Sequence, residues 1–352
     1  MDRLLVTGGA GFIGSNFVHH LVGHTDARIT VLDKMTYAAS RESLAGLPED
    51  RVELVVGDVA DPAAVARSLV GIDVVCHQAA KVGLGDGVAD LPDYVARNDL
   101  GTAQLLSAMA AADVGRVVLA SSMVVYGEGA YRCAEHGSVR PGPRTRVDLD
   151  AGRFEPRCPR CGQGLSPDVV DEDAPLDPRN GYAATKVAQE HLASTWARVT
   201  GGEAVALRYH NVYGPRLPRD TPYAGVASFF RSSLGRGEAP RVFEDGRQRR
   251  DFVHVRDVAH ANVLALGGST GPVGEPLTAY NIASGQPVTV GEMATALAIA
   301  LGGPGPVVTG EYRLGDVRHV VASPERARTR LGFSAAVPLA DGLAAFAHER
   351  EE

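Results

Sequence analysis

Short apolar runs alternate with longer amphipathic stretches over most of this chain. The runs at residues 4–6, 29–32, 52–56, 73–77, 116–120 and 204–207 have the composition of buried parallel strands. The stretch after residue 12 and the segment from 93 to about 112 have helical spacing. Regular alternation of strand and helix predicts an α/β fold, a Rossmann-type doubly wound parallel sheet, to which residues 280–283 add a late strand.

A glycine-rich sequence directly follows the first predicted strand. Gly8, Gly11 and Gly14 form a Gly-x-x-Gly-x-x-Gly loop between that strand and an amphipathic helix. Glycines permit a tight turn and let backbone amides approach a pyrophosphate at the helix N-terminus. The loop, in this strand-to-helix context, predicts a dinucleotide site.

The second predicted strand ends in Asp33. It follows the glycine loop by about twenty residues, a position from which a carboxylate can bind a ribose 2′-hydroxyl. A carboxylate there would repel a 2′-phosphate, which favours NAD over NADP. The nearby cations Lys34 and Arg41 leave NADP open.

Three residues are candidates for catalysis. Tyr182 and Lys186 are four residues apart on a predicted helix and therefore share a face. An ammonium close to a phenol favours the phenolate, so we expect Lys186 to lower the tyrosine pKa and create a general acid or base. Ser122 ends the central predicted strand, where ligands bind in open parallel sheets.

Later motifs complete a pattern that covers nearly the whole chain. They are residues 207–216 (LRYHNVYGPR), 250–255 (RDFVHV) and 313–316 (RLGD). Together with the glycine loop and Tyr182-x-x-x-Lys186, they resemble the extended short-chain dehydrogenase/reductase family, and within it the nucleotide-sugar epimerases and dehydratases. The resemblance implies an NAD cofactor, a nucleotide-diphosphate sugar substrate, and a homodimer formed through the helices after Asp93 and from Tyr182.

The resemblance also implies which residues line the two ligand sites. Those for the cofactor are Gly8, Gly11, Phe12, Ile13, Gly14, Asp33, Lys34, Asp58, Val59, Ala79, Ala80, Lys81, Asn98, Tyr182, Lys186 and Tyr209. Those for the substrate are Lys81, Ser122, Met123, Asn211, Arg216, Val242, Arg250, Arg313 and Asp316. Among these, Arg250 and Arg313 are implied as phosphate ligands, since arginine forks match phosphate oxygens, and Asp316 is implied on the nucleotide ribose.

The residues after Ser122 separate the subclasses. The 4,6-dehydratases of this family carry Asp-Glu directly after the catalytic Ser or Thr, where Met123 and Val124 stand here. Neither side chain can move a proton, which favours a 4-epimerase that returns the hydride to the opposite face. Segments 80–85 and 219–225, with the insertion described below, resemble the dTDP-L-rhamnose 4-epimerases, which make dTDP-6-deoxy-L-talose.

Other functions remain open at this point. A UDP- or dTDP-glucose-type 4-epimerase, or a UDP-glucuronate 4-epimerase, is the neighbouring interpretation. An NADPH-dependent nucleotide-4-keto-sugar reductase would use the same three catalytic residues. A non-catalytic NAD-binding protein would keep the glycine loop alone.

Residues 128–177 depart from the family pattern. They contain Cys133-x-x-His136 and Cys158-x-x-Cys161 in a polar loop rich in proline, arginine and glycine. These are two halves of a tetrahedral metal site, and the segment has little apolar content with which to order itself. We predict a structural zinc on Cys133, His136, Cys158 and Cys161. Free thiols or a redox pair are the alternatives.

The motifs suggest a division of the chain. We expect residues 1–207 to form an NAD-binding Rossmann domain that carries 128–177 as an insertion and regains residues 251–283. Residues 208–250 and 284–352 would bind the nucleotide sugar. The net charge of −7 argues against a nucleic-acid partner. No apolar run reaches the length of a membrane span and no signal-peptide layout opens the sequence, so we expect a cytoplasmic protein with no membrane partner.

Overall fold

The computed structural model describes residues 2–83, 87–218, 225–267 and 275–348. Leu84, Gly85 and residues 219–224, which contribute to the rhamnose-epimerase resemblance, lie outside the described residues. Within the described ranges, no helix combines the length and the apolar character that crossing a bilayer requires.

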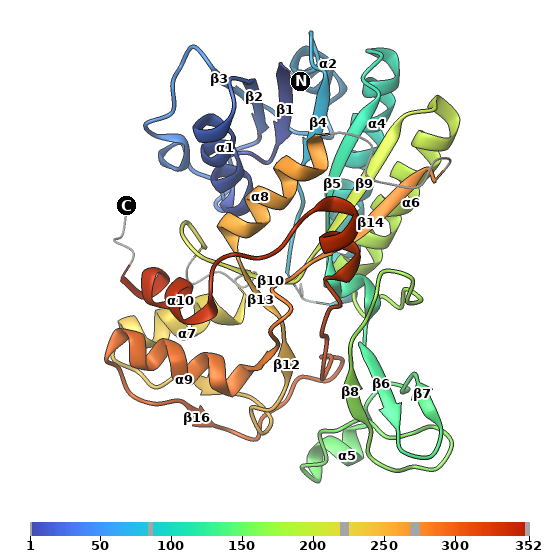
Figure 1. The fold of residues 1–352 in the computed structure, drawn as a ribbon, viewed down its shortest axis with the longest axis vertical. Coiled ribbons are helices and arrows are strands. Elements are labelled where there is room, and N and C mark those ends of the chain that lie inside the picture. The colour runs from blue at the N-terminus through green and yellow to red at the C-terminus, as the bar shows by residue number, and fades with distance from the viewer. Residues whose placement is uncertain (1, 84–86, 219–224, 268–274, 349–352) are drawn as a thin grey trace.

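The predicted parallel sheet is the centre of the structure (Figure 1). Its seven strands pair in parallel in the order β14-β9-β5-β4-β1-β2-β3. They are β1 (Arg3–Thr7), β2 (Arg28–Asp33), β3 (Val52–Val56), β4 (Val74–His77), β5 (Arg116–Ser122), β9 (Glu203–Tyr209) and β14 (Leu277–Ile282). The chain reverses its direction of winding between β1 and β4, and ligands bind at such a switch point in open α/β sheets.

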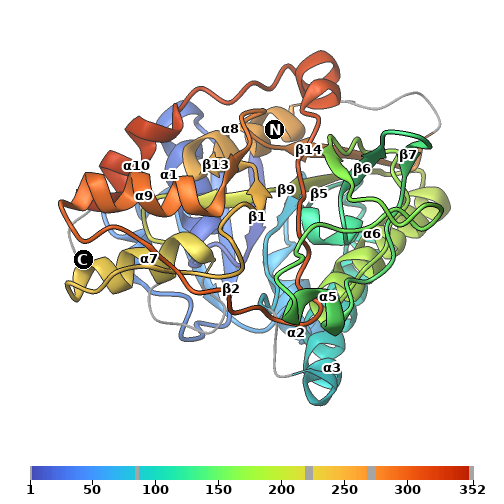
Figure 2. The ribbon, with the colours of Figure 1, turned by 90° about the horizontal axis from the view of Figure 1, so that it is seen from below.

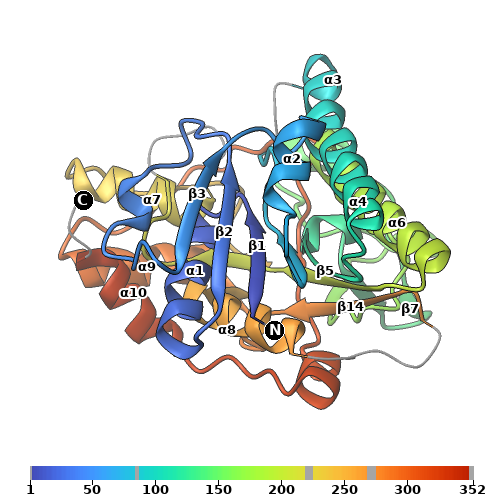
Figure 3. The ribbon, with the colours of Figure 1, turned by 90° about the horizontal axis from the view of Figure 1, so that it is seen from above.

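Helices cover both faces of this sheet (Figure 3). On β1, Leu4 and Val6 join one buried cluster with helices α1 (Phe12–His24) and α8 (Val255–Leu266), whereas Leu5 joins another. The second cluster lies under α2 (Pro62–Ser68), α4 (Gly101–Ala111) and α6 (Gly181–Thr200). Burial on both faces explains why the strands are apolar throughout rather than alternating.

The long helix expected from residue 93 to about 112 is interrupted. The structure has α3 (Leu91–Tyr94), then a π-helical turn (Val95–Leu100), then α4. A π turn adds a residue to the helical repeat and re-aims the side chains that follow, often at functional sites. Here the turn contains Asn98, which is buried and hydrogen-bonded to the loop after β4.

The C-terminal region builds a smaller layer beside the sheet. Its helices α7 (Val226–Gly235), α9 (Val290–Leu301) and α10 (Leu339–His348) share one apolar cluster and lie together, away from α6 (Figure 2). Short strand pairs connect them: β10 (Asn211–Tyr213) with β13 (Phe252–His254), β11 (Arg241–Val242) with β16 (Val307–Val308), and β12 (Arg249–Arg250) with β15 (Val288–Thr289).

The insertion forms a separate small sheet below the main one (Figure 1). Its strands are β6 (Ala130–Cys133), β7 (Gly137–Val139) and β8 (Ser166–Asp168), with a short helix α5 (Arg146–Asp150). The cluster beneath them contains only five buried side chains, namely Tyr131, Cys133, Val139, Cys158 and Leu165. So small an apolar core ordinarily needs a cross-link or a metal to stay ordered.

Candidate active site

The glycine loop joins β1 to α1 at the switch point. Gly8 has φ 69°, and a Cβ added to it would lie 2.7 Å from the backbone nitrogen of Ala79. A Cβ on Gly14 would overlap the carbonyl of Gly8. At Gly11 the nearest atom to an added Cβ is 3.4 Å away. The first and third glycines are therefore required by internal packing, while the second keeps the backbone open to a ligand.

Asp33 is held rigidly at the end of β2. Its carboxylate accepts hydrogen bonds from the backbone nitrogens of Ala10 (3.1 Å) and Met35 (2.9 Å). Lys34 turns instead to Asp58, with 2.9 Å between Nζ and Oδ2. A fixed carboxylate beside the glycine loop fits a ribose diol, so this edge suits a dinucleotide. The other cofactor candidates of this edge begin α1 or follow β3: Phe12, Ile13 and Val59.

The three catalytic candidates meet at the adjoining strand end. Ser122 is the last residue of β5, and Tyr182 lies in the first turn of α6. Asn180 caps this helix by accepting a hydrogen bond from the backbone nitrogen of Ala183 at 2.8 Å. The Ser122 hydroxyl is close enough to the Tyr182 phenol to favour its ionised form and so to lower its pKa. Lys186 lies one turn further on, with its Nζ 5.8 Å from the centre of the Tyr182 ring.

The predicted lowering of the Tyr182 pKa is wrong for this structure. Burial raises the pKa of Tyr182 to about 12, and the Ser122 hydroxyl opposes that rise only partly. Lys186 donates its own hydrogen bond to the carbonyl of Ala120 at 2.7 Å. Burial lowers the pKa of Lys186 to about 7, against the attraction of Glu190. Desolvation, which sequence spacing does not report, is the largest influence on the pKa of both Tyr182 and Lys186.

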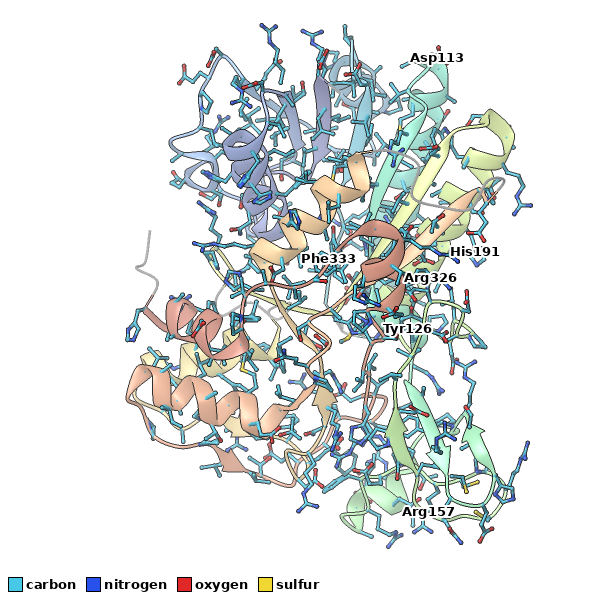
Figure 4. All side chains as sticks on the ribbon, in the orientation of Figure 1. Asp113, Tyr126, Arg157, His191, Arg326 and Phe333 are labelled. Carbon is cyan, nitrogen blue, oxygen red and sulfur yellow. The ribbon has the colours of Figure 1, made fainter. Side chains whose placement is uncertain are left out.

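A buried polar network supports this strand end, and sequence analysis misses it. Glu190 on α6 accepts hydrogen bonds from the Ser121 hydroxyl and from both Nε and Nη2 of Arg208, at 3.0 and 2.8 Å. Arg208 also donates a hydrogen bond to the hydroxyl of Tyr126 at 2.9 Å. Tyr126 is labelled in Figure 4. The sequence does contain one signal of this network. Arg208 lies inside an otherwise apolar strand, and a buried arginine needs a buried carboxylate as its partner.

The cofactor candidates Lys81 and Asn98 are hydrogen-bonded to each other. The Asn98 side chain accepts from the Lys81 backbone nitrogen (2.7 Å) and donates to its carbonyl (3.0 Å) and to the Thr185 hydroxyl (2.9 Å). The Lys81 ammonium pairs with Asp93 at 2.8 Å and with Asp90 at 3.2 Å. Asn98 thus ties the loop after β4 to the catalytic helix α6.

Tyr209 is likewise engaged within the protein. Its hydroxyl accepts a hydrogen bond from Gln78 at 3.0 Å and donates to Asn262 at 2.9 Å, and burial raises its pKa. Any contact of Tyr209 with a ligand would come from the ring or the backbone. Gln78 is followed by the two small cofactor candidates Ala79 and Ala80, so this cluster fixes their backbone.

Arg250 is only partly available to a phosphate. Its guanidinium donates three hydrogen bonds, to the carbonyls of Arg249 (2.9 Å), Val317 (2.8 Å) and Arg318 (2.8 Å). An arginine has five N–H donors, so at most two remain for a ligand. Arg250 therefore binds the backbone of the segment 312–319 and has at most two donors left for a diphosphate.

The other substrate candidates fall into four groups. Arg313 lies over the Phe243 ring at 5.2 Å, and burial raises the pKa of Asp316. Arg216 has φ 66° and donates to Asn16 Oδ1 at 3.2 Å, which joins the C-terminal region to α1. Val242 is wholly buried, so its side chain cannot touch a ligand and only its backbone could. The remaining two follow Ser122 or open β10: Met123 and Asn211.

The four predicted metal ligands come together in the insertion. All their ligand atoms lie within 4.8 Å of one another. Cys133 Sγ is 3.5 Å from His136 Nδ1 and 3.6 Å from Cys161 Sγ, and Cys158 Sγ is 3.7 Å from His136 Nδ1. A tetrahedral ion with metal–sulfur bonds of about 2.3 Å would hold its sulfurs about 3.8 Å apart. The cluster could therefore hold a metal ion.

Comparison with known proteins identifies the family of this chain. A model of the NAD dependent epimerase/dehydratase family matches residues 4–145 and 161–283. The chain belongs to this family. It is thus an NAD-dependent enzyme of the nucleotide-sugar epimerase/dehydratase group, and the unmatched residues between the two ranges fall in the insertion.

Individual relatives divide between the two activities. The chain is 33% identical to dTDP-L-rhamnose 4-epimerase of Burkholderia thailandensis, over 97% of this chain and 93% of that protein. It is 31% identical to dTDP-glucose 4,6-dehydratase of Streptomyces niveus, over 97% and 90%. Among solved structures, UDP-glucose 4-epimerase of Thermus thermophilus in complex with NAD has a TM-score of 0.77 and 30% identity, and covers 98% of this chain and 97% of that one.

Proposed function

We propose that this enzyme is a nucleotide-sugar 4-epimerase. The observation that carries the proposal is the grouping of Ser122, Tyr182 and Lys186 at the end of β5, followed by Met123 and Val124 in the next turn. Loss of water from a keto sugar needs a second acid and base beside the reacting carbons. Methionine and valine supply neither, whereas an epimerase needs none.

The roles of the residues follow from their chemistry. Bound NAD supplies a hydride acceptor, then a hydride donor, and a positive charge. Tyr182 takes the proton of the C4 hydroxyl, Ser122 hydrogen-bonds the same oxygen, and Tyr182 returns the proton after the sugar has turned. Because burial raises the pKa of Tyr182 to about 12, the positive charge of bound NAD would help to favour the phenolate.

For the cofactor, we propose the glycine loop as the pyrophosphate site and Asp33 as the ribose ligand. The open space at Gly11 and the fixed carboxylate support this placement. Asp33 also argues against an NADPH-dependent keto-sugar reductase, since it would repel a 2′-phosphate.

For the substrate, dTDP-L-rhamnose is our first choice, with dTDP-6-deoxy-L-talose as product. Similarity to the Burkholderia thailandensis enzyme over almost the full length supports this choice. A UDP- or dTDP-glucose-type 4-epimerase or a UDP-glucuronate 4-epimerase is the alternative, because glucose epimerases are relatives at similar identity. We place the diphosphate near Arg250 and Arg313 and the nucleotide ribose near Asp316.

A structural zinc is the proposed occupant of the Cys133, His136, Cys158 and Cys161 cluster. The interatomic distances fit a tetrahedral ion, and four protein ligands leave no open position for catalysis. Metal analysis of the purified protein should give one zinc per chain. Cys158→Ser should remove it, and a zinc content that Cys158→Ser leaves unchanged would contradict this ligand set.

A homodimer through the α3–α4 run and α6 is also proposed. Leu91, Val95 and Leu100 on this run are exposed apolar side chains, which a partner would cover. Light scattering should give twice the mass of one chain.

The decisive experiment is incubation of the purified protein with dTDP-L-rhamnose, without added cofactor, followed by NMR of the sugar. A new C4 epimer without net NADH would support both the reaction and the sugar. Tyr182→Phe should abolish turnover and leave NAD binding intact, and unchanged activity in this variant would contradict the mechanism. A product formed only from a keto sugar with NADPH would assign the enzyme to the reductases.

A further inference from the structure

The segment 312–319 carries Arg313 and Asp316 but belongs to no helix or strand. Such a segment has no internal hydrogen-bond ladder to define its shape, so its conformation depends on the elements packed against it. The chain of the C-terminal region passes there between the smaller helical layer and the insertion, as Figure 1 shows beside β8.

The insertion holds the backbone of this segment directly. Arg144 Nη2 donates to the Asp316 carbonyl at 2.6 Å. The Arg318 backbone nitrogen donates to the Glu128 carboxylate at 3.0 and 3.1 Å. The backbone nitrogen of His319 donates to the Tyr131 hydroxyl at 3.1 Å. Each of these partners comes from residues 128–177.

Two buried arginines also connect the insertion to the C-terminal region through ion pairs. Arg144 pairs with Glu244 at 2.7 Å, and both side chains are at most 5% exposed. The Arg318 side chain is wholly buried and pairs with Glu155 of the insertion at 2.6 Å, with Glu244 at 2.8 Å and with Asp245 at 2.7 Å. Buried arginine–carboxylate pairs of this kind have well-defined geometry, and removing one partner strongly destabilises the fold.

We propose that the insertion positions the nucleotide-binding segment: through Arg144, Glu128 and Glu155 it fixes residues 312–319 in the conformation that presents Arg313 and Asp316 to a nucleoside diphosphate. The cluster of Cys133, His136, Cys158 and Cys161 in the insertion would then support substrate affinity without touching the substrate. The inference rests on the proposed function, because it needs Arg313 and Asp316 to contact the nucleotide. It makes Arg144 a positioning residue, not a catalytic one.

Arg144→Met tests this role, with Arg153→Met as the matched control. Arg153 lies in the same insertion, but its half-exposed side chain pairs with Asp148 of the insertion itself. Calorimetric binding of dTDP and of UDP, steady-state kinetics and zinc content should be measured for the wild type and both variants. Arg144→Met should weaken nucleoside diphosphate binding and raise KM by about 3- to 30-fold, with kcat and zinc content nearly unchanged.

Further variants separate positioning from a general loss of folding. Arg144→Lys keeps the charge and can reach one acceptor, so it should restore part of the affinity. If Arg144→Met does not fold, Glu155→Gln, whose side chain is 42% exposed, replaces it with the same readouts. Chelation of the metal should weaken dTDP binding and leave NAD binding in place, and added zinc should reverse the loss.

The outcomes distinguish this inference from the proposed function. If the wild type binds neither dTDP nor UDP, the proposed function fails. If the wild type binds one of them and a folded Arg144→Met variant binds it equally well, the positioning role is wrong. Equal losses in Arg144→Met and Arg153→Met would also overturn it, because the effect would then not follow the contacts to the segment.

Discussion

Gly14→Ala tests whether the glycine loop is shaped by internal packing. Gly14 is the third residue of α1, where alanine is by itself the better helix former by about 1 kcal/mol. The new Cβ would overlap the Gly8 carbonyl and lie 2.7 Å from Gly9 Cα, where carbon atoms ordinarily stay about 3.5–4.0 Å apart. Both neighbours are backbone, which cannot rotate away, so overpacking of about 1–3 kcal/mol should exceed the helix-propensity gain.

The assay is thermal unfolding with and without NAD, together with NAD affinity. With an unfolding entropy of about 2.1 cal/mol/K per residue, a net loss of about 2 kcal/mol would lower Tm by about 3 °C in this chain. NAD binding should weaken as well, because the N-terminus of α1 must move.

Gly11→Ala is the matched control within the same loop. Its Cβ would meet nothing closer than 3.4 Å, so the stability cost should stay below about 1 kcal/mol, the usual effect at a helix N-cap. NAD affinity should nevertheless fall about tenfold or more, since the methyl occupies the space kept open for the pyrophosphate. A Gly14→Ala variant as stable as wild type, or a Gly11→Ala variant less stable than Gly14→Ala, would refute this reasoning.

Three further perturbations address the network, the buried amine and the cofactor choice. Arg208→Met removes one partner of a buried pair and should cost about 3–5 kcal/mol in urea unfolding because Glu190 stays buried, whereas the exposed pair lost in Arg328→Met should cost about 0–1 kcal/mol. Burial lowers the pKa of Lys186 to about 7, so between pH 7 and about 10.5 the unfolded chain binds more protons than the folded chain. The stability of the wild type should therefore rise with pH over this range relative to that of Lys186→Met. A difference in unfolding free energy between the two proteins that stays constant with pH would contradict the shift. Asp33→Asn should reduce the preference for NAD over NADP by about tenfold or more, as measured by titration with each dinucleotide, because the repulsion of the 2′-phosphate is lost.

Predictions that depend on residues close in sequence are confirmed by the structure. The seven-stranded parallel sheet follows from apolar runs of strand length, and each run coincides with a strand except that Asp73 and Ala283 lie one residue outside β4 and β14. Within Cys133-x-x-His136 and Cys158-x-x-Cys161, the short spacing already places two ligand atoms near each other. The grouping of the two halves could be inferred because an insertion with so few apolar residues needs a cross-link.

Properties that depend on burial could not be predicted in this way. The Tyr182–Lys186 spacing is the same whether the phenol is in water or enclosed, but the enclosure raises the pKa of Tyr182 to about 12. Arg250 follows a family motif, yet two of its hydrogen bonds go to carbonyls about seventy residues away in the chain, at Val317 and Arg318. The π turn likewise contains Asn98, whose side chain binds the backbone of Lys81 in the loop after β4, a contact that the local spacing does not indicate.

The sequence by itself determined the strands and helices, the glycine loop and the chemical types available at the site, because these depend on local periodicity and on the side chains themselves. Only the tertiary structure decided how each polar group is bound. Arg144, Glu155 and Arg318 have no motif, and their contacts join segments more than seventy residues apart. Hydrogen-bond partners and desolvation are properties of the folded surroundings, so the support of the site emerges only when those segments meet.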